Sequence, residues 1–243
     1  MTTQLHKPSI ILVNPQLGEN IGMVARAMLN CGLTDLRVVN PRDGWPSESA
    51  IRASSGALDK GVIVTIYDTT QDAIADMHWT LATTARPRDM VKEVYTAGSA
   101  MAETHNKIKN GQKIGVLFGA ERTGLENEDI ALASAIITIP LNPDFCSLNL
   151  AQAVLLVAYE FMVQADQTPE KQLVTGKTDI ATAATVANFT DRVIAEMDDR
   201  GFFKSPDMRP TMERNLMNLF TRHTWTDQDI QTFHGVISAL IKE

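Results

Sequence analysis

Three polar, glycine-containing stretches carry the residue types that could do chemistry in this chain. The longest runs from Ile139 to Ala153, IPLNPDFCSLNLAQA, and joins a β-branched run to an apolar helical run. Pro140 and Pro143 fix φ and remove two backbone donors. A strand end that leads into a helix start is where α/β proteins bind small ligands, because free N–H groups and the helix dipole converge there. The pattern therefore predicts a ligand site at this joint.

Four side chains within this joint could contact a ligand or build the turn. Asn142, Ser147 and Asn149 offer hydrogen bonds to a substrate, and each could equally form a turn or cap the following helix. Cys146 could act as a nucleophile, but no histidine lies near it in sequence, so we interpret it as a packing residue.

The stretch from Asn14 to Ala27, NPQLGENIGMVARA, follows the first apolar run. Asn20 is expected to cap the helix that begins here. Arg26 lies four residues after Gly22, so both share a helix face that the glycine leaves open. The alternative is a surface ion pair between Arg26 and a carboxylate. No G-x-G-x-x-G pattern occurs here, which disfavours a dinucleotide site.

The stretch from Gly115 to Leu125, GVLFGAERTGL, places Glu121 and Arg122 between two glycines after a buried run. This order suggests a ligand loop at the carboxyl edge of a sheet. The alternative is a glycine-rich turn with a Glu–Arg surface pair. The G-K-[ST] of a phosphate-binding P-loop is absent from this stretch.

A weaker signal follows another strand-like run, at Leu81 to Arg88, LATTARPR. Thr83 and Thr84 stand at the expected strand end, with Arg86 and Arg88 just beyond. Two arginines at a ligand edge could grip a phosphate. A solvated basic turn explains the same residues equally well.

The elements that would position these stretches alternate along the first two-thirds of the chain. Near-continuous apolar strands alternating with helices predict an α/β fold, with a parallel sheet covered by helices on both faces. We expect strands near Ser9–Val13, Leu36–Val39, Val62–Ile66, Trp79–Thr83, Ile114–Phe118 and Ile136–Ile139. We expect helices over Ile21–Cys31, Gln71–Asp76, Gly98–Asn110, Asn127–Ser134 and Leu150–Val163.

The polar stretch from Gln164 to Thr178 is predicted to be a linker, and the β-rich pattern is absent after it. Helical periodicity over Thr185–Arg200, Thr211–Arg222 and Asp227–Ile241 predicts a small all-helical extension, with Thr226 or Asp227 as a cap. The predicted domain boundaries are 1–164 for the α/β domain, 165–180 for the linker and 181–243 for the helical extension.

Composition narrows the location and the partners. The chain has 243 residues, two cysteines and a formal net charge of −7. Two cysteines make no disulfide framework, and we expect neither a secretory signal nor a membrane span, so the cytoplasm is the predicted location. A zinc-type Cys/His cluster is absent from the sequence, and we expect no metal. The negative charge argues weakly against nucleic acid, but leaves room for a confined basic face.

Together the three stretches resemble the three motifs of the SPOUT superfamily of RNA methyltransferases, in its TrmH-like 2′-O-ribose branch. Asn20 to Ala27, Phe118 to Leu125 and Ile139 to Ala153 carry the resemblance, in that order. Gly201-Phe202-Phe203, the Leu219 to Arg222 segment and the last helix resemble the carboxyl extension of TrmJ-type enzymes, which methylate the ribose of C or U at position 32 of the tRNA anticodon loop.

The resemblance implies a sheet whose carboxyl part forms a deep trefoil knot around S-adenosylmethionine. It implies an obligate homodimer that binds tRNA, in which Arg26 reaches a site completed by the partner. Cys146 departs from the small polar residue common in close relatives. The implied cofactor residues are Thr83, Thr84, Ala85, Gly119, Ile139, Cys146, Ser147 and Leu148. The implied catalytic residues are Arg26, Ser147 and Asn149, and the implied substrate contacts are Asn20, Glu121, Arg86 and Arg88.

The implied reaction is attack of a ribose 2′-hydroxyl on a methyl group. The resemblance assigns removal of the hydroxyl proton to Arg26. Because a guanidinium stays charged at physiological pH, we assign Arg26 to orienting the phosphate and stabilising the developing alkoxide, whether or not it also takes the proton. Ser147 and Asn149 would position the ribose or Arg26. Three alternatives stay open: ribose methylation at another tRNA or ribosomal RNA position, an RNA-binding module without catalysis, and a nucleotide-binding Rossmann enzyme. Candidate RNA contacts are Arg86, Arg88 and Lys92, with Arg209, Arg214 and Arg222 in the extension.

Overall fold

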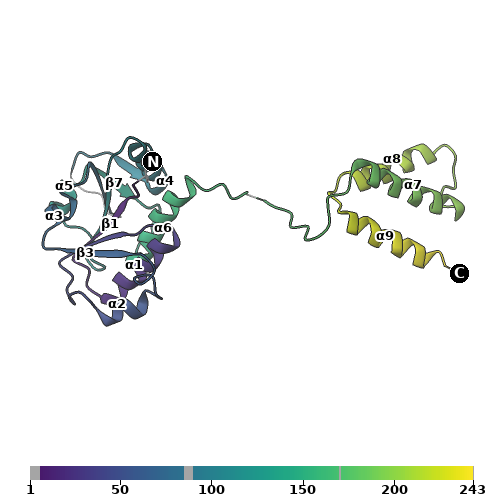
Figure 1. Ribbon diagram of the computed structural model, residues 1–243. Coiled ribbons are helices and arrows are strands. Elements are labelled where there is room, and N and C mark those ends of the chain that lie inside the picture. Colours follow the sequence, from purple (N-terminus) through teal and green to yellow (C-terminus); the bar gives the residue numbers. More distant parts are fainter. Residues whose placement is uncertain (1–5, 85–89, 170, 243) are drawn as a thin grey trace. The chain divides into compact units, whose positions relative to one another are not determined.

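The computed structural model describes residues 6–84, 90–169 and 171–242 (Figure 1). The chain divides into two compact units, Met1–Thr168 and Pro169–Glu243, which we call the body and the tail. The body is an α/β unit, as the sequence predicts, and the described part of the tail contains helices joined by loops.

The described residues of the body form one parallel sheet of seven strands in the order β3-β2-β1-β6-β4-β7-β5. The expected strands are all present, which confirms the parallel sheet. The sequence missed β5, whose three residues are too few to show a period. The strands are β1 Ser9–Val13, β2 Asp35–Val39, β3 Ile63–Tyr67, β4 Trp79–Thr83, β5 Val94–Thr96, β6 Ile114–Phe118 and β7 Ala135–Thr138.

Helices cover both faces of this sheet. Side chains alternate along β1, so that Ile10 and Leu12 face one apolar core while Ile11 and Val13 face the other. The first core is closed by α1 Gly18–Asn30, α2 Glu48–Ala53, α4 Ala97–Lys109 and α6 Leu150–Val163. The second is closed by α3 Thr70–Ile74 and α5 Asn127–Leu132.

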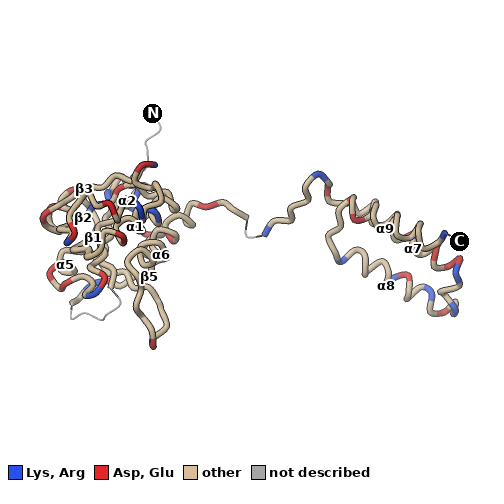
Figure 2. Tube along the Cα trace, turned by 90° about the horizontal axis from the view of Figure 1, so that it is seen from below, with Lys and Arg blue, Asp and Glu red and all other residues tan. Residues whose placement is uncertain are grey.

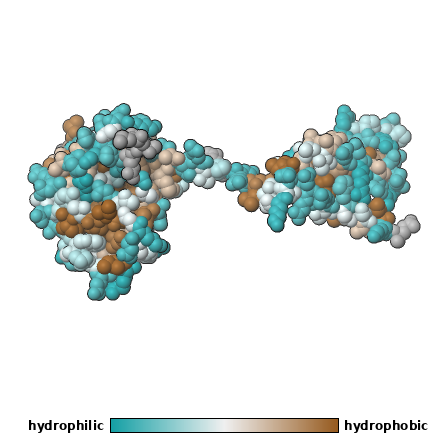
Figure 3. Space-filling model, in the orientation of Figure 1, coloured by the Kyte–Doolittle hydropathy of each residue, from teal (hydrophilic) through white to brown (hydrophobic). Residues whose placement is uncertain are grey.

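Side chains on both faces of the edge strand β3 are exposed, whereas the sequence predicted that helices cover both faces of the sheet. Ile63 is 68% exposed and Ile66 40% exposed, and apolar residues gather over β3 on the face seen in Figure 3. The apolar run predicted a buried strand, but β3 pairs with β2 on one side and forms the sheet edge on the other.

In the tail, the described residues form α7 Ala183–Asp199, α8 Arg209–Thr221 and α9 Asp227–Leu240. Phe189 is 1% exposed and packs edge-on against Phe220, with ring centroids 5.0 Å apart. The indole N–H of Trp225 donates to the carbonyl of Phe220 at 2.6 Å. Thr226 caps α9 in a capping box with Asp229, as expected.

Candidate functional site

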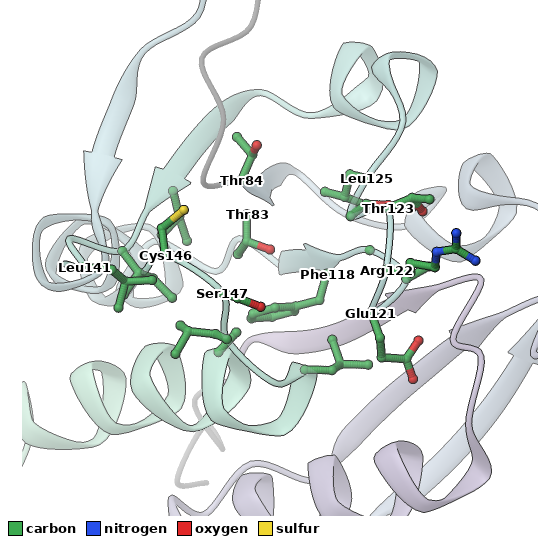
Figure 4. A pocket seen from close by; sticks show the side chains of 18 residues that line it. Thr83, Thr84, Phe118, Glu121, Arg122, Thr123, Leu125, Leu141, Cys146 and Ser147 are labelled. Atoms are coloured by element: carbon green, nitrogen blue, oxygen red, sulfur yellow. Dashed lines mark hydrogen bonds between the residues drawn. The ribbon is translucent and has the colours of Figure 1, made fainter. Parts of the chain in front are cut away.

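The carboxyl ends of β4, β6 and β7 surround a pocket of about 290 Å³ in the body (Figure 4). Sequence segments far apart in the chain meet there, because parallel neighbours end at the same sheet edge. The pocket is lined by Thr83, Thr84, Phe118, Gly119, Ala120, Glu121, Arg122, Thr123, Gly124, Leu125, Ile137, Ile139, Leu141, Cys146, Ser147, Leu148, Leu150 and Ala153.

This pocket brings together most of the residues that the sequence assigned to a cofactor. One of these, Ala85, lies outside the described residues, as do Arg86 and Arg88, which were assigned to the substrate. The seven other assigned residues all line the pocket: Thr83, Thr84, Gly119, Ile139, Cys146, Ser147 and Leu148.

Gly119 occupies a position where the loop folds back on itself. A Cβ there would lie 2.0 Å from the carbonyl carbon of Gly124, far inside contact distance. The loop is held closed by the amide of Gly124, which donates to the carbonyl of Ala120 at 2.8 Å. Glycine at 119 is therefore required for the loop that forms one wall of the pocket.

Glu121 fixes the start of α1 from a distant part of the sequence. Its carboxylate accepts hydrogen bonds from the amide of Gln16 at 2.8 Å, the amide of Leu17 at 3.3 Å and the side-chain amide of Asn20 at 2.6 Å. Burial acts to raise the pKa of Glu121, but these hydrogen bonds outweigh it and hold the pKa below its ordinary value. The surface pair with Arg122 considered as an alternative does not form.

Asn20 therefore has a different role from the helix cap that the sequence suggested. The helix begins at Gly18, and Leu17 is the N-cap residue without a side-chain hydrogen bond. Asn20 lies inside the first turn and is 4% exposed. The first amide of the helix, that of Gly18, donates to Oδ2 of Asp43 at 3.3 Å, while Glu121 accepts from the amides of Gln16 and Leu17 just before the helix.

Asn149 connects the third stretch to the other two. It caps α6 in a capping box with Gln152, as the sequence allowed. Its side-chain amide also donates to Oδ1 of Asn20 at 3.0 Å. Glu121, Asn20 and Asn149 thus form one chain of hydrogen bonds, which ties together residues up to 129 positions apart.

Arg26 is exposed and does not line the pocket within one chain. The face it shares with Gly22 is not open, contrary to the expectation, because α2 packs across it. A Cβ at Gly22 would lie 2.1 Å from the carbonyl oxygen of Ala50. The guanidinium donates to Oγ of Ser55 at 3.1 Å, and no carboxylate pairs with it among the described residues.

Two further candidate residues, Asn142 and Lys92, make hydrogen bonds to nearby parts of the fold. Asn142 accepts from the amide of Asp144 at 3.0 Å and builds the turn after β7. Lys92 donates to the carbonyls of Ala131 and Ala133 at the end of α5, so its ammonium is engaged at a helix terminus rather than free for RNA.

Two residues of the site, Ser55 and Leu141, were not predicted from the sequence. The loop beyond α2 supplies Ser55 to Arg26, and Leu141 adds an apolar wall to the pocket. Leu141 lies within the third stretch, so its apolar side chain among polar neighbours was an available signal. Ser55 had none, because its role depends on how α2 packs against α1.

Neither a cluster of metal-ligating side chains nor a membrane-spanning helix is found in the part of the chain that the structure describes. No group of three His, Cys, Asp or Glu side chains there is arranged to hold a metal ion. No helix of residues 6–84, 90–169 and 171–242 is both long and apolar enough to cross a membrane.

Known proteins are similar to this chain over nearly its whole length. A curated tRNA (cytidine/uridine-2′-O-)-methyltransferase TrmJ from Photorhabdus laumondii is 32% identical over 237 residues, which cover 96% of each chain. The crystal structure of TrmJ from Z. mobilis ZM4 is 44% identical, with a TM-score of 0.83, and covers 98% of this chain and 100% of that one.

A shorter relative matches about two thirds of this chain. A structure concerned with 2-OH methylation of C/U34 on tRNA is 25% identical, with a TM-score of 0.54, and covers 65% of this chain and 96% of its own. The model of the SpoU rRNA Methylase family matches residues 7–159, which contain all three stretches. The resemblance found in the sequence is confirmed, and this chain belongs to the SpoU rRNA methylase family.

Proposed function

We propose that this chain transfers a methyl group from S-adenosylmethionine to the ribose 2′-hydroxyl of a C or U in tRNA, at anticodon-loop position 32. The observation that carries the proposal is the hydrogen-bond chain from Glu121 through Asn20 to Asn149. It unites the three motifs of a methylase family beside one pocket. Full-length relatives bear the name tRNA (cytidine/uridine-2′-O-)-methyltransferase.

The pocket fits S-adenosylmethionine in size and in chemistry. Its volume of about 290 Å³ is near the lower end of ligand pockets, roughly 300 Å³. Ile139, Leu141 and Leu148 offer apolar contact, and the tight loop at Gly119 exposes backbone where a side chain would block it. The cofactor would supply an electrophilic methyl group, and these residues with Thr83, Thr84, Cys146 and Ser147 would hold it.

The protein's own contribution is positioning and charge. Arg26 would orient the phosphate beside the target ribose and stabilise the oxygen as its proton leaves. Ser147 lies on the exposed rim of the pocket, and its hydroxyl makes no hydrogen bond within the described residues, so it is available to the ribose. Asn149 is committed to Asn20 and the α6 cap, which favours a positioning role.

A homodimer would bring Arg26 to a pocket that it does not reach within one chain. The two helices that pack side by side, α1 and α6, carry exposed apolar side chains suited to burial against a second copy. Leu155 is 41% exposed, Leu156 40%, Tyr159 50% and Met23 on α1 37%. A site shared between two copies would account for the exposed position of Arg26, whose guanidinium donates to Ser55 at the surface of its own chain.

The sheet order supports the trefoil knot. β7 lies between β4 and β5, although residues 84–93 alone connect those two strands. A strand from later in the chain that lies between two consecutive strands is consistent with a knotted path. Knotted chains are rare, so the family rather than general rules suggests this path.

The target position has two alternatives. The relative that concerns C/U34 leaves about a third of this chain unmatched, which favours a different position for a chain with a tail. Ribosomal RNA is the other alternative, because the family description names it.

Labelled S-adenosylmethionine tests the activity and its substrate class together. We expect label to enter unfractionated tRNA and not ribosomal RNA, and the enzyme to bind S-adenosylmethionine but not NAD. Labelled ribosomal RNA would move the target to that alternative. Binding of NAD without methyl transfer would favour the Rossmann reading, and tRNA binding without transfer would favour an inactive RNA-binding module.

A further inference from the structure

We propose that the outward face of α8 binds the phosphate backbone of the RNA substrate. We define this α8 face by the exposed residues Thr211, Arg214, Asn215, Asn218 and Arg222. The proposal rests on the proposed function, because it takes as partner the RNA that function requires.

Helix periodicity sets these five residues on one side of α8. They recur at three- and four-residue steps, and Arg222 continues the helical geometry just after Thr221. The opposite side carries Met212, Leu216 and Phe220, which are half-buried. Phe220 packs on Phe189 in the tail core, so the α8 face points to solvent.

The α8 face is cationic in a chain whose net charge is −7. Two arginines and three neutral polar side chains make it up, and none of its five residues is acidic. Positions of Lys and Arg appear in blue along the α8 segment in Figure 2. On a protein of negative net charge, a local positive face favours binding of a polyanionic partner.

The two arginines of this face are not neutralised by carboxylates. Nε of Arg214 donates to the carbonyl of Pro210 and its Nη2 to the hydroxyl of Thr211, both at 3.2 Å. Nε of Arg222 donates to the ring of His223 at 3.2 Å. Because none of these partners is a carboxylate, both guanidinium groups are available to pair with a phosphate.

Other arginines of the tail differ in this respect. Arg209, a sequence candidate for RNA contact, pairs with Asp198 at 3.0 Å and Glu213 at 2.7 Å. Arg200 pairs with Glu196 at 2.8 Å. Arg192 is half-buried and donates to Ser238 at 2.7 Å. Charge pairing of Arg209 and Arg200, and the partial burial of Arg192, therefore narrow the arginine candidates to Arg214 and Arg222.

The spacing fits two separate phosphates. Eight residues of helix separate Arg214 and Arg222, which is about 12 Å along the axis. Asn215 and Asn218 lie between them and make no side-chain hydrogen bond within the described residues. Their amides can donate to phosphate or ribose oxygens in the same stretch of backbone.

Equilibrium tRNA binding of the full-length protein over a range of salt tests this surface. We expect Arg214→Gln with Arg222→Gln to weaken binding roughly 30-fold at 0.1 M salt and to lower the slope of log K against log salt by about 1.6. Arg214→Lys with Arg222→Lys should restore most of the affinity. Arg200→Gln, which removes an equally exposed but paired charge, is the matched control and should change binding less than about threefold.

An unchanged salt slope in the double glutamine variant would overturn the proposal, as would an equal loss in the Arg200 control. Thermal unfolding of each variant shows whether the tail stays folded, and the lysine variant keeps the test decisive if glutamine destabilises it. Methyl transfer is measured separately. Wild type that binds tRNA through this face without methylating it would contradict the proposed function alone, and wild type that does not bind tRNA would contradict both.

Discussion

A single carboxylate, that of Glu121, orders the residues around the pocket. Three N–H groups from the first motif converge on it, and Asn20 passes the connection on to Asn149. An amide that donates at one end and accepts at the other has its orientation fixed. Substitution at Glu121 should therefore disturb α1 as well as the loop that carries it.

Glu121→Gln should lower the free energy of unfolding at pH 7 by about 1–2 kcal/mol, because an amide cannot accept the three donors as a carboxylate does. The folded pKa lies below the ordinary value, so the contribution is complete above about pH 5 and is lost as acid protonates the folded carboxyl. Urea unfolding at pH 7 and at acid pH checks this. The exposed Glu128→Gln is the matched control, and a difference between wild type and Glu121→Gln that grows in acid would contradict the account.

Arg26→Ala should lose nearly all methyl transfer, about a hundredfold or more, because its charge would no longer stabilise the developing alkoxide. S-adenosylmethionine binding should be unchanged, since the proposed role of Arg26 is toward the RNA and it is not among the residues that line the pocket of its own chain. Calorimetric titration and a methyl-transfer assay separate the two effects. Retained turnover would remove Arg26 from the mechanism.

Cys146→Ser should stay within about threefold of wild-type activity, because the cysteine lines the pocket without a covalent task. Steady-state kinetics with tRNA and S-adenosylmethionine measure the effect. An inactive but folded Cys146→Ser would show that the thiol is required and that its interpretation as packing is wrong.

At the scale of elements, the position of α1 against α2 depends on a glycine. Gly22→Ala places a methyl group 2.1 Å from a carbonyl oxygen of α2, which should cost about 1–3 kcal/mol as the helices separate. Gly235→Ala in α9 meets nothing within 4 Å and should gain up to about 1 kcal/mol of helix propensity. Hydrogen exchange of the α1 and α9 amides reports both. A stabilised α1 in Gly22→Ala would contradict the packing described.

The regular strands and long helices could be predicted because their apolar periods are local. β5 and α2 could not, since β5 has three residues and α2 has six, and their places depend on β7 and α1. The cap at Asn20 was wrong for a similar reason: the helix begins at Gly18, and the Asn20 side chain donates instead to Glu121, 101 positions away. The pocket was foreseen because strand ends of a parallel sheet converge.

At the scale of the whole molecule, a site formed by two subunits can be tested by combining two inactive variants in one dimer. Neither Arg26→Ala nor Gly119→Ala should be active alone, the second because its Cβ would displace the pocket wall. Co-expressed, they should recover up to about a quarter of wild-type activity, since half of the dimers are mixed and each has one complete site. The measurement is the activity of the co-expressed mixture and of purified mixed dimers, which should reach up to about half of wild type. No recovery in mixed dimers would place Arg26 and the pocket in the same chain.

The central claim is that this chain methylates a ribose hydroxyl of tRNA. The most direct measurement is methyl transfer onto unfractionated tRNA lacking the modification, followed by mass-spectrometric mapping of the methylated nucleotide. The account predicts 2′-O-methylcytidine or 2′-O-methyluridine at position 32, and none with Arg26→Ala. A methyl group on a base, or no methyl transfer by a protein that binds S-adenosylmethionine, would contradict it.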